Sequence, residues 1–448
     1  MNLFNRIHLS SFQVISIGFL LVILTGALLL MLPGATVAPG SASFSDALFT
    51  SVSAVCVTGL VIQDTATYWT GFGQAVILTL IQIGGMGVVT LAVAVTMISG
   101  KKISLMQRST MQEAISAHHV GGIVRLTGFI IKVTIVIEVI GGLLLGLVFS
   151  RDFGILRGIW YGLFHSISAF CNAGFDLMGQ NQPFSSLTAY VGDPLINLTI
   201  AGLIVIGGIG FLTWEDVRTN GWHLRRYRMQ SKVILATTLL LILLPTLFFF
   251  LLEFSKPKWA EFSAGERFLA SLFQAVTPRT AGFNTVNLGE MSESSLSCMI
   301  ILMLTGGSPG STAGGMKTTT IAVLFLSALS VFHRRETVRC LGRRIEMETV
   351  RNAAAILLMY LTLFLFGGLA ISQLEGLPVL DCLFEAASAI GTVGLSLGIT
   401  PNLSEPSRFI LMALMFFGRV GGLTLIFAAA SGKRKYVSTL PKEKITVG

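Results

Sequence analysis

The sequence predicts an all-α integral membrane protein, and three observations support that prediction. Of the 448 residues, 53% are apolar and only 12% are charged, about half the charge of a typical soluble protein. The mean hydropathy is +0.78. Several apolar stretches are long enough to cross about 30 Å of hydrocarbon as helices. Together these features exclude a soluble enzyme, a nucleic-acid-binding domain and a disordered chain.

Eight long apolar segments are predicted to be transmembrane helices, and four shorter ones alternate with them. The shorter segments are too short to cross a bilayer, and such lengths are typical of re-entrant helices. The first long segment exceeds the apolar core of a signal peptide and is followed by a second, so we interpret it as a spanning helix. The predicted spans are 12–32, 72–98, 122–149, 194–213, 232–253, 296–332, 352–374 and 408–431, and the short segments are 44–56, 156–170, 265–277 and 379–390.

Lysine and arginine predict the orientation in the membrane. Most of the 31 basic residues fall in loops on one side, including 214–232 and 333–351, and few fall on the other. Cytoplasmic loops carry the excess of these residues, so both termini should be cytoplasmic and the short segments should enter from outside.

The four short segments share one sequence pattern. They read LFTSVSAVCVTGL (48–60), LFHSISAFCNAGF (163–175), LFQAVTPRTAGF (272–283) and LFEAASAIGTVGL (383–395). Each ends in a glycine followed by leucine or phenylalanine, at intervals close to one quarter of the chain. The third copy is one residue shorter and contains Pro278, so its local geometry should differ.

This pattern predicts four tandem repeats of helix, pore helix, filter and helix around a pseudo-fourfold pore. The whole chain would then contain eight transmembrane helices and four re-entrant pore helices. The predicted repeats occupy residues 1–100, 101–231, 232–351 and 352–431, followed by a cytoplasmic tail at 432–448.

The short segments also predict a pathway for cations. A half-spanning helix followed by extended chain is tolerated at membrane depth only where it is buried in protein or lines a water-filled path. Four such units around an axis would present rows of carbonyl oxygens, which can replace the water shell of a cation. Glycine permits the required backbone angles. Glycine-containing half-helices also occur in secondary transporters and in water or anion channels, which is the alternative interpretation.

Over essentially its whole length, the sequence resembles the Trk/Ktr/HKT superfamily of potassium (and sometimes sodium) translocating proteins. It is closest to the Ktr-type membrane subunit, because the two additional N-terminal helices of Trk-type members are absent. With one glycine per strip instead of TVGYG, the resemblance implies a less regular filter with fewer ion sites. Glycine in all four copies looks like the potassium-selective pattern. The implied filter residues, with potassium at their backbone carbonyls, are Val57, Thr58, Gly59, Asn172, Ala173, Gly174, Thr280, Ala281, Gly282, Thr392, Val393 and Gly394, and each strip ends at the following leucine or phenylalanine.

The second long helix of each predicted repeat is interrupted by glycines, at 83–87, 206–210, 304–317 and 417–422. Paired glycines in a membrane helix indicate close packing or a bend. The third interruption cannot be a continuous helix, and a non-helical loop at this depth should border the pore. The resemblance implies that this loop, 305–316, is the gate. The gate residues so implied include Thr305, Gly306, Gly307, Ser308, Pro309, Gly310, Ser311, Thr312, Ala313, Gly314 and Gly315.

Charged residues inside predicted spans are energetically costly and favour a functional role. Lys317 follows the loop, although a lysine there could instead extend to the cytoplasmic face. In proteins of the similar family, the arginine corresponding to Arg419 lies beneath the filter as an electrostatic barrier and a partner of the gate. Arg279 lies beside the third strip, where its charge would repel a cation. We therefore expect its side chain to point away from the axis and to hold the strip.

No motif of an enzyme is present. The loop sequence approaches a phosphate-binding pattern, but Met316 separates the required glycine and lysine. The five cysteines are scattered singly and indicate neither a disulfide framework nor a zinc site. We therefore predict no enzymatic activity, no cofactor and no transition metal, with potassium as the transported ion and sodium as a candidate activator. The driving force would be the membrane potential, about 2.3 kcal/mol per charge per 100 mV.

The resemblance implies a cytosolic ring of nucleotide-binding, Rossmann-type regulatory subunits, a homodimer of the membrane subunit and a location in the plasma membrane. The basic loops and the tail after Ser431 would dock that ring or contact anionic lipid. They also account for the net charge of +9 without a nucleic-acid partner. Two alternatives stay open: a symporter that couples potassium to sodium or protons, and a membrane scaffold or enzyme subunit.

Overall fold

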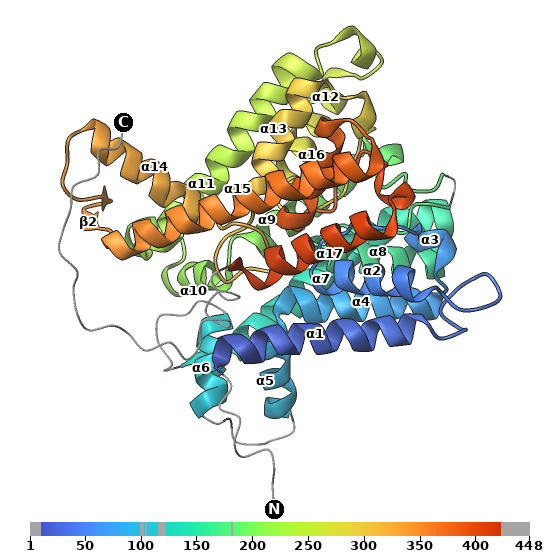
Figure 1. The fold of residues 1–448 in the computed structure, drawn as a ribbon, viewed down its shortest axis with the longest axis horizontal. Coiled ribbons are helices and arrows are strands. Elements are labelled where there is room, and N and C mark those ends of the chain that lie inside the picture. The colour runs from blue at the N-terminus through green and yellow to red at the C-terminus, as the bar shows by residue number, and fades with distance from the viewer. Residues whose placement is uncertain (1–9, 99–102, 104, 115–121, 181, 423–448) are drawn as a thin grey trace, which may run out of the picture.

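The computed structural model describes residues 10–98, 103, 105–114, 122–180 and 182–422, and these are mostly helical, as predicted (Figure 1). The last part of the predicted span 408–431 and the predicted tail 432–448 lie outside the described residues. The only strands among the described residues are β1 (Arg339–Cys340) and β2 (Arg343–Arg344), which pair in an antiparallel hairpin. In Figure 1 this hairpin, α14 and the start of α15 extend away from the other helices.

Four described helices are long and apolar enough to cross a membrane. They are α1 (Ser11–Leu30), α7 (Ile123–Phe153), α11 (Met229–Phe248) with its π-helical continuation η4 (Phe249–Glu253), and α15 (Met347–Glu375). The sequence predicted a span at each place. Leucines on α1, such as Leu21 and Leu28, are more than half exposed. An apolar exposed stripe of this kind suits contact with lipid.

Short helices follow each of these long ones, again where the sequence predicted them. They are α2 (Phe44–Val55), α8 (Ile155–Phe170), α12 (Ala264–Val276) and α16 (Val379–Gly391). The side chain of Ser263 accepts the backbone N–H of Glu266, whose carboxylate accepts the N–H of Ser263, so a capping box begins α12. Glycines let α8 lie close to α7, since a Cβ on Gly162 would lie closer than 3.0 Å to the backbone of Gly142 and Gly146.

Three of the remaining apolar segments are broken helices. A connector helix, α3 (Thr65–Tyr68), precedes α4 (Gly71–Met86), which is followed directly by α5 (Val88–Ile98); α6 (Leu105–Ala114) comes next. The pair α9 (Pro194–Gly208) and α10 (Phe211–Asn220) bends by 96°. The structure places a non-helical loop between α13 (Glu293–Leu304) and α14 (Thr318–Phe332). The last helix among the described residues is α17 (Glu405–Val420).

The glycine interruptions at 83–87 and 206–210 each combine close packing with a break in the helix. A Cβ on Gly84 or Gly207 would lie closer than 3.0 Å to the backbone carbonyl oxygen of Val55 or Phe170, at the ends of α2 and α8. Three residues later, Gly87 and Gly210 adopt φ values of 85° and 92° and end the helical geometry. Within each interruption, one glycine therefore permits close packing and another permits the break.

Candidate functional site

The chain after each short helix adopts the same unusual backbone conformation. A residue other than glycine has a positive φ first: Val57 at 56°, Asn172 at 60°, Thr280 at 68° and Thr392 at 51°. Two residues later comes the strip glycine, with φ between 70° and 95°. For a residue with a Cβ this conformation costs roughly 1–2 kcal/mol. Strain that recurs at equivalent positions is typical of functional sites held by their surroundings.

The four strips meet in a closed ring. A Cβ on Gly59 would lie closer than 3.0 Å to the carbonyl oxygen of Ala173 in the second strip. The same relation links Gly174 to Ala281 in the third strip and Gly282 to Val393 in the fourth. Gly394 completes the circle, because its Cβ would reach the carbonyl oxygen of Thr58 in the first strip. All twelve predicted filter residues therefore belong to four segments that the structure brings together.

Backbone hydrogen bonds hold each strip to its own short helix. The N–H groups of Thr58, Ala173 and Val393 each donate, at 2.8 Å, to the carbonyl five residues earlier. The third strip differs, as its shorter sequence predicts: Ala281 N–H donates over four residues, to the Thr277 carbonyl at 3.0 Å.

Hydroxyl groups on the short helices support the strips, and the prediction of site residues missed them. Ser53 and Ser388 accept the N–H of their strip glycines, Gly59 and Gly394, at 3.1 and 3.0 Å. Ser168 donates to the Phe175 carbonyl at 2.7 Å, and Thr277 donates to that of Phe283 at 2.5 Å. When the four segment sequences are aligned, serine or threonine occupies this same position in each of them, and this could have identified the residues.

The prediction also missed the polar residue that follows the Leu-Phe pair in each of the four short segments. His165 Nε2 accepts a hydrogen bond from the backbone N–H of Leu177 at 3.3 Å. Glu385 accepts three hydrogen bonds from the segment after the fourth strip: from the Ser396 hydroxyl at 2.6 Å, the Leu397 N–H at 3.0 Å and the Thr400 hydroxyl at 2.6 Å. These buried side chains fix the chain that leaves the strips.

Replacing Glu385 with glutamine is expected to lower the free energy of unfolding by about 1–3 kcal/mol. The two carboxylate oxygens together accept three hydrogen bonds, whereas the single oxygen of the amide cannot accept all three. Thermal unfolding in detergent measures the change, with Glu261→Gln as the control at an exposed position. Equal midpoints for the two variants would show that Glu385 has no such supporting role.

The non-helical loop lies against two neighbouring broken helices. The N–H groups of Ser308 and Thr312 donate to the carbonyls of Gly208 and Gly207 at 3.0 and 3.3 Å. On the other side, Gly315 N–H donates to the Gly418 carbonyl at 3.1 Å. The loop is thus fixed by backbone bonds to the end of α9 and to α17.

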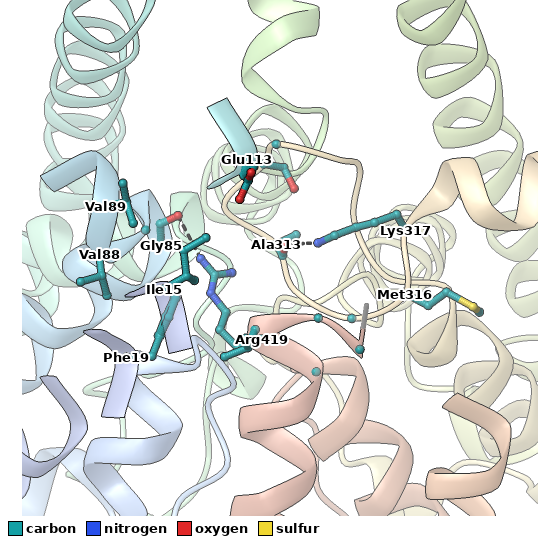
Figure 2. Close-up of a pocket in the computed structure, with 18 of the residues that line it drawn as sticks. Ile15, Phe19, Gly85, Val88, Val89, Glu113, Ala313, Met316, Lys317 and Arg419 are labelled. Carbon is teal, nitrogen blue, oxygen red and sulfur yellow. Dashed lines mark hydrogen bonds between the residues drawn. The ribbon is translucent and has the colours of Figure 1, made fainter. Parts of the chain in front are cut away.

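Arg419 and Lys317 extend toward this loop from either side of Ala313 (Figure 2). The Arg419 guanidinium donates to the carbonyls of Thr312, Gly84 and Gly85. Lys317 Nζ donates to the Ala313 and Gly314 carbonyls at 2.9 and 3.3 Å. Each partner is a backbone carbonyl, so among the described residues these bonds involve no carboxylate. Arg419 therefore joins the loop to α4 and α17.

Arg279 reaches an outer helix. Its side chain is buried, and Nη2 donates to the Thr238 hydroxyl on α11 at 3.3 Å. The neighbouring leucines 239 and 240 are more than half exposed, which marks α11 as peripheral. This contact agrees with the expectation that Arg279 holds the third strip.

Two cavities with no shared lining residue flank the site. One, of about 420 Å³, includes the four strip glycines, Asp64 and Asp176 in its wall. The other, of about 310 Å³, is lined by the loop, Lys317, Arg419 and Glu113 of α6 (Figure 2). The strips and the loop therefore each face an open space.

The chain is similar to known cation transport proteins over most of its length. The family model described as "TrkH: Cation transport protein" matches residues 9–437. The chain is 41% identical to Ktr system potassium uptake protein B of Bacillus subtilis (strain 168), covering 95% of this chain and 94% of that protein. It is 37% identical to the potassium/sodium uptake protein NtpJ of Enterococcus hirae, covering 99% and 98%.

A solved structure shows the same fold. The potassium transporter TrkH from Vibrio parahaemolyticus matches with a TM-score of 0.70 at 21% identity, over 93% of this chain and 84% of that one. The resemblance stated from the sequence is thereby confirmed: the chain belongs to the TrkH family of cation transport proteins.

Proposed function

We propose that this protein takes up potassium across the plasma membrane through a filter made of the backbone carbonyls of four strips. The main support for this proposal is the closed ring in which each strip glycine lies against a carbonyl of the next strip. Carbonyl rings can replace the hydration shell of a potassium ion. The four segments of helix, short helix, strip and helix would then be four repeats around one pore, entered from outside by the short helices.

The loop 305–316 is proposed as the gate. It lies against the fourth strip, where a Cβ on Gly314 would meet the Thr392 side chain, and it lines the same cavity as Arg419 and Lys317. The loop contains five glycines, which permit the backbone angles that a second position of the loop would require. Arg419 would act both as a clamp on the closed loop and as a positive barrier to cations.

The names of the relatives support potassium as the cargo and a multi-component system. One is named a potassium uptake protein of a "Ktr system", and another is named a potassium/sodium uptake protein. We propose a cytosolic nucleotide-binding regulatory ring and a homodimer of this chain as its partners, with both termini in the cytoplasm. The relatives are named as transport proteins, which favours transport over an enzyme or scaffold role.

Growth of a potassium-uptake-deficient cell at low external potassium tests the proposal. Expression of this chain with its regulatory partner is expected to restore growth. Failure to restore it, with the protein present in the membrane, would contradict potassium uptake.

A second candidate is uptake of potassium coupled to sodium, favoured by the potassium/sodium name of a relative with 37% identity. The reversal potential distinguishes the two. Channel-like uptake follows the potassium equilibrium potential, whereas coupled uptake departs from it in proportion to the sodium gradient.

The cavity lined by the strip glycines and Asp176, which would face the outside, gives a prediction about external pH. Burial raises the pKa of Asp176 to about 7, and the neighbouring Asp64 carboxylate adds to the rise. The carboxyl is therefore mostly neutral at pH 6 and charged at pH 8. A negative charge beside the strips concentrates cations, so the KM for external potassium should fall by about threefold over this range.

Asp176→Asn should remove this pH dependence and keep the KM at its acidic value. Uptake measured at a series of external pH values checks it, with Glu261→Gln as the surface control. An unchanged slope in Asp176→Asn would assign the pH dependence to another group.

A further inference from the structure

One side chain of the strips makes contacts on two sides. Asn172, in the second strip, is fully buried. Its Nδ2 donates to the Thr280 hydroxyl at 3.2 Å and to the Arg279 carbonyl at 3.4 Å, both at the third strip. Its Oδ1 accepts the hydroxyl of Thr312 at 3.1 Å, and Thr312 belongs to the loop. A single amide therefore joins two strips to the loop.

Thr312 is the loop residue whose side chain hydrogen-bonds to a strip residue. Its hydroxyl also lies 3.0 Å from the Phe170 carbonyl at the end of α8. Its N–H donates to Gly207, and its carbonyl accepts from Arg419. A Cβ on Gly207 would lie closer than 3.0 Å to both the Thr312 hydroxyl and Asn172 Oδ1, so the junction is tightly packed.

The amide at position 172 is not required by the backbone conformation. Asparagine tolerates a positive φ, but valine and threonine adopt the same conformation in the other strips. The hydroxyl of Ser311, by contrast, bonds within the loop, to the Ser308 carbonyl at 2.7 Å. The backbone conformation of the strip therefore does not by itself require the contact between Thr312 and Asn172.

We propose that Thr312 and Asn172 couple the position of the loop to the ion preference of the strips. With the loop in place, the Thr312 hydroxyl fixes the Asn172 amide, which holds Thr280 and so the third strip. When the loop withdraws, Oδ1 loses its donor, and the amide is free to rotate. Thr312 is then a positioning residue and Asn172 a determinant of selectivity. This inference rests on the proposed filter and gate.

A double-mutant cycle on the full chain, expressed with its regulatory partner, tests the coupling. The variants are Thr312→Val, which removes the hydroxyl at constant shape, and Asn172→Gly, which removes the amide and keeps the positive φ. The readout is the ratio of the KM values for sodium and potassium, which does not depend on how much protein reaches the membrane.

Each single substitution is expected to change this ratio by about threefold or more. The double variant should match Asn172→Gly, because the bond that Thr312→Val breaks toward Asn172 is already absent in that variant. Thr312→Ser and Ser311→Ala should keep the wild-type ratio. Thr312→Ala serves as a second variant without a hydroxyl if valine prevents folding.

Two results would overturn the coupling while leaving potassium uptake intact: an unchanged ratio in the variants without the hydroxyl, or independent effects that multiply in the double variant. Absence of potassium uptake in the wild type would instead overturn the proposed function, and this inference with it.

Discussion

Gly282→Ala is expected to reduce potassium uptake by at least about tenfold. Gly282 has a φ of 83°, and an added Cβ would lie closer than 3.0 Å to the Val393 carbonyl oxygen. The Cα atoms of Gly174 and Gly394 would be 3.1 and 3.2 Å from it. The nearby atoms are backbone in a closed ring, which cannot yield as a flexible side chain can. Alanine would therefore displace a carbonyl of the proposed filter, beyond the roughly 1–2 kcal/mol cost of its own conformation.

Initial rates of potassium uptake, normalised to the amount of protein in the membrane, measure this effect. Gly202→Ala is the matched control, because Gly202 lies inside α9 with no atom within 4 Å of an added Cβ. The control should transport at the wild-type rate. Wild-type uptake by Gly282→Ala would show that this glycine does not border the ion path.

Arg419→Gln is expected to increase the uptake rate, by about tenfold, in the absence of the regulatory partner. The guanidinium donates to carbonyls of the loop and of α4, and hydrogen bonds to a charged group contribute about 1.5–3 kcal/mol each. Only the bond to Thr312 holds the loop itself, and loss of the lower value, about 1.5 kcal/mol, changes the ratio of open to closed loops by a factor of about ten. The substitution also removes a positive charge from the cavity that the loop and Lys317 line.

Arg419→Lys separates these two effects. Lysine keeps the charge but lacks the planar fork that reaches Thr312, Gly84 and Gly85 together. Its uptake rate should lie between those of the wild type and Arg419→Gln. A rate at or below the wild-type rate for Arg419→Gln, at normal membrane levels, would contradict the clamp.

Eight spanning helices were predicted, and four of them are described as continuous helices long enough to cross a membrane, each followed by a predicted short helix. Hydropathy and segment length reflect burial in lipid directly, but they do not show where glycines break a helix. The sequence also identified the strip glycines, since the repeated pattern aligns four independent copies. The hydrogen-bonding roles of Ser53, Ser168, Thr277 and Ser388 were not foreseen. A small hydroxyl residue in an apolar helix has many uses, and only the backbone path beside it decides which N–H or carbonyl it meets.

Arg419 illustrates the other limit. The resemblance implied a partner in the loop, but the sequence could not indicate that all three acceptors are carbonyls, one of them the far-distant Gly84. Likewise, paired glycines at 83–87 and 206–210 were compatible with packing or bending. Whether a glycine packs or bends depends on the neighbouring helix, which local sequence does not specify.

The ring of strips has a consequence for how changes accumulate. In a ring of four identical chains, any substitution occurs four times and the symmetry is kept. Here each quarter is encoded separately, and the third already differs in length and in its N–H acceptor. A substitution therefore alters one quadrant alone, and the four positions can specialise independently, one quadrant bonding to the loop through Asn172 while the other three carry different side chains.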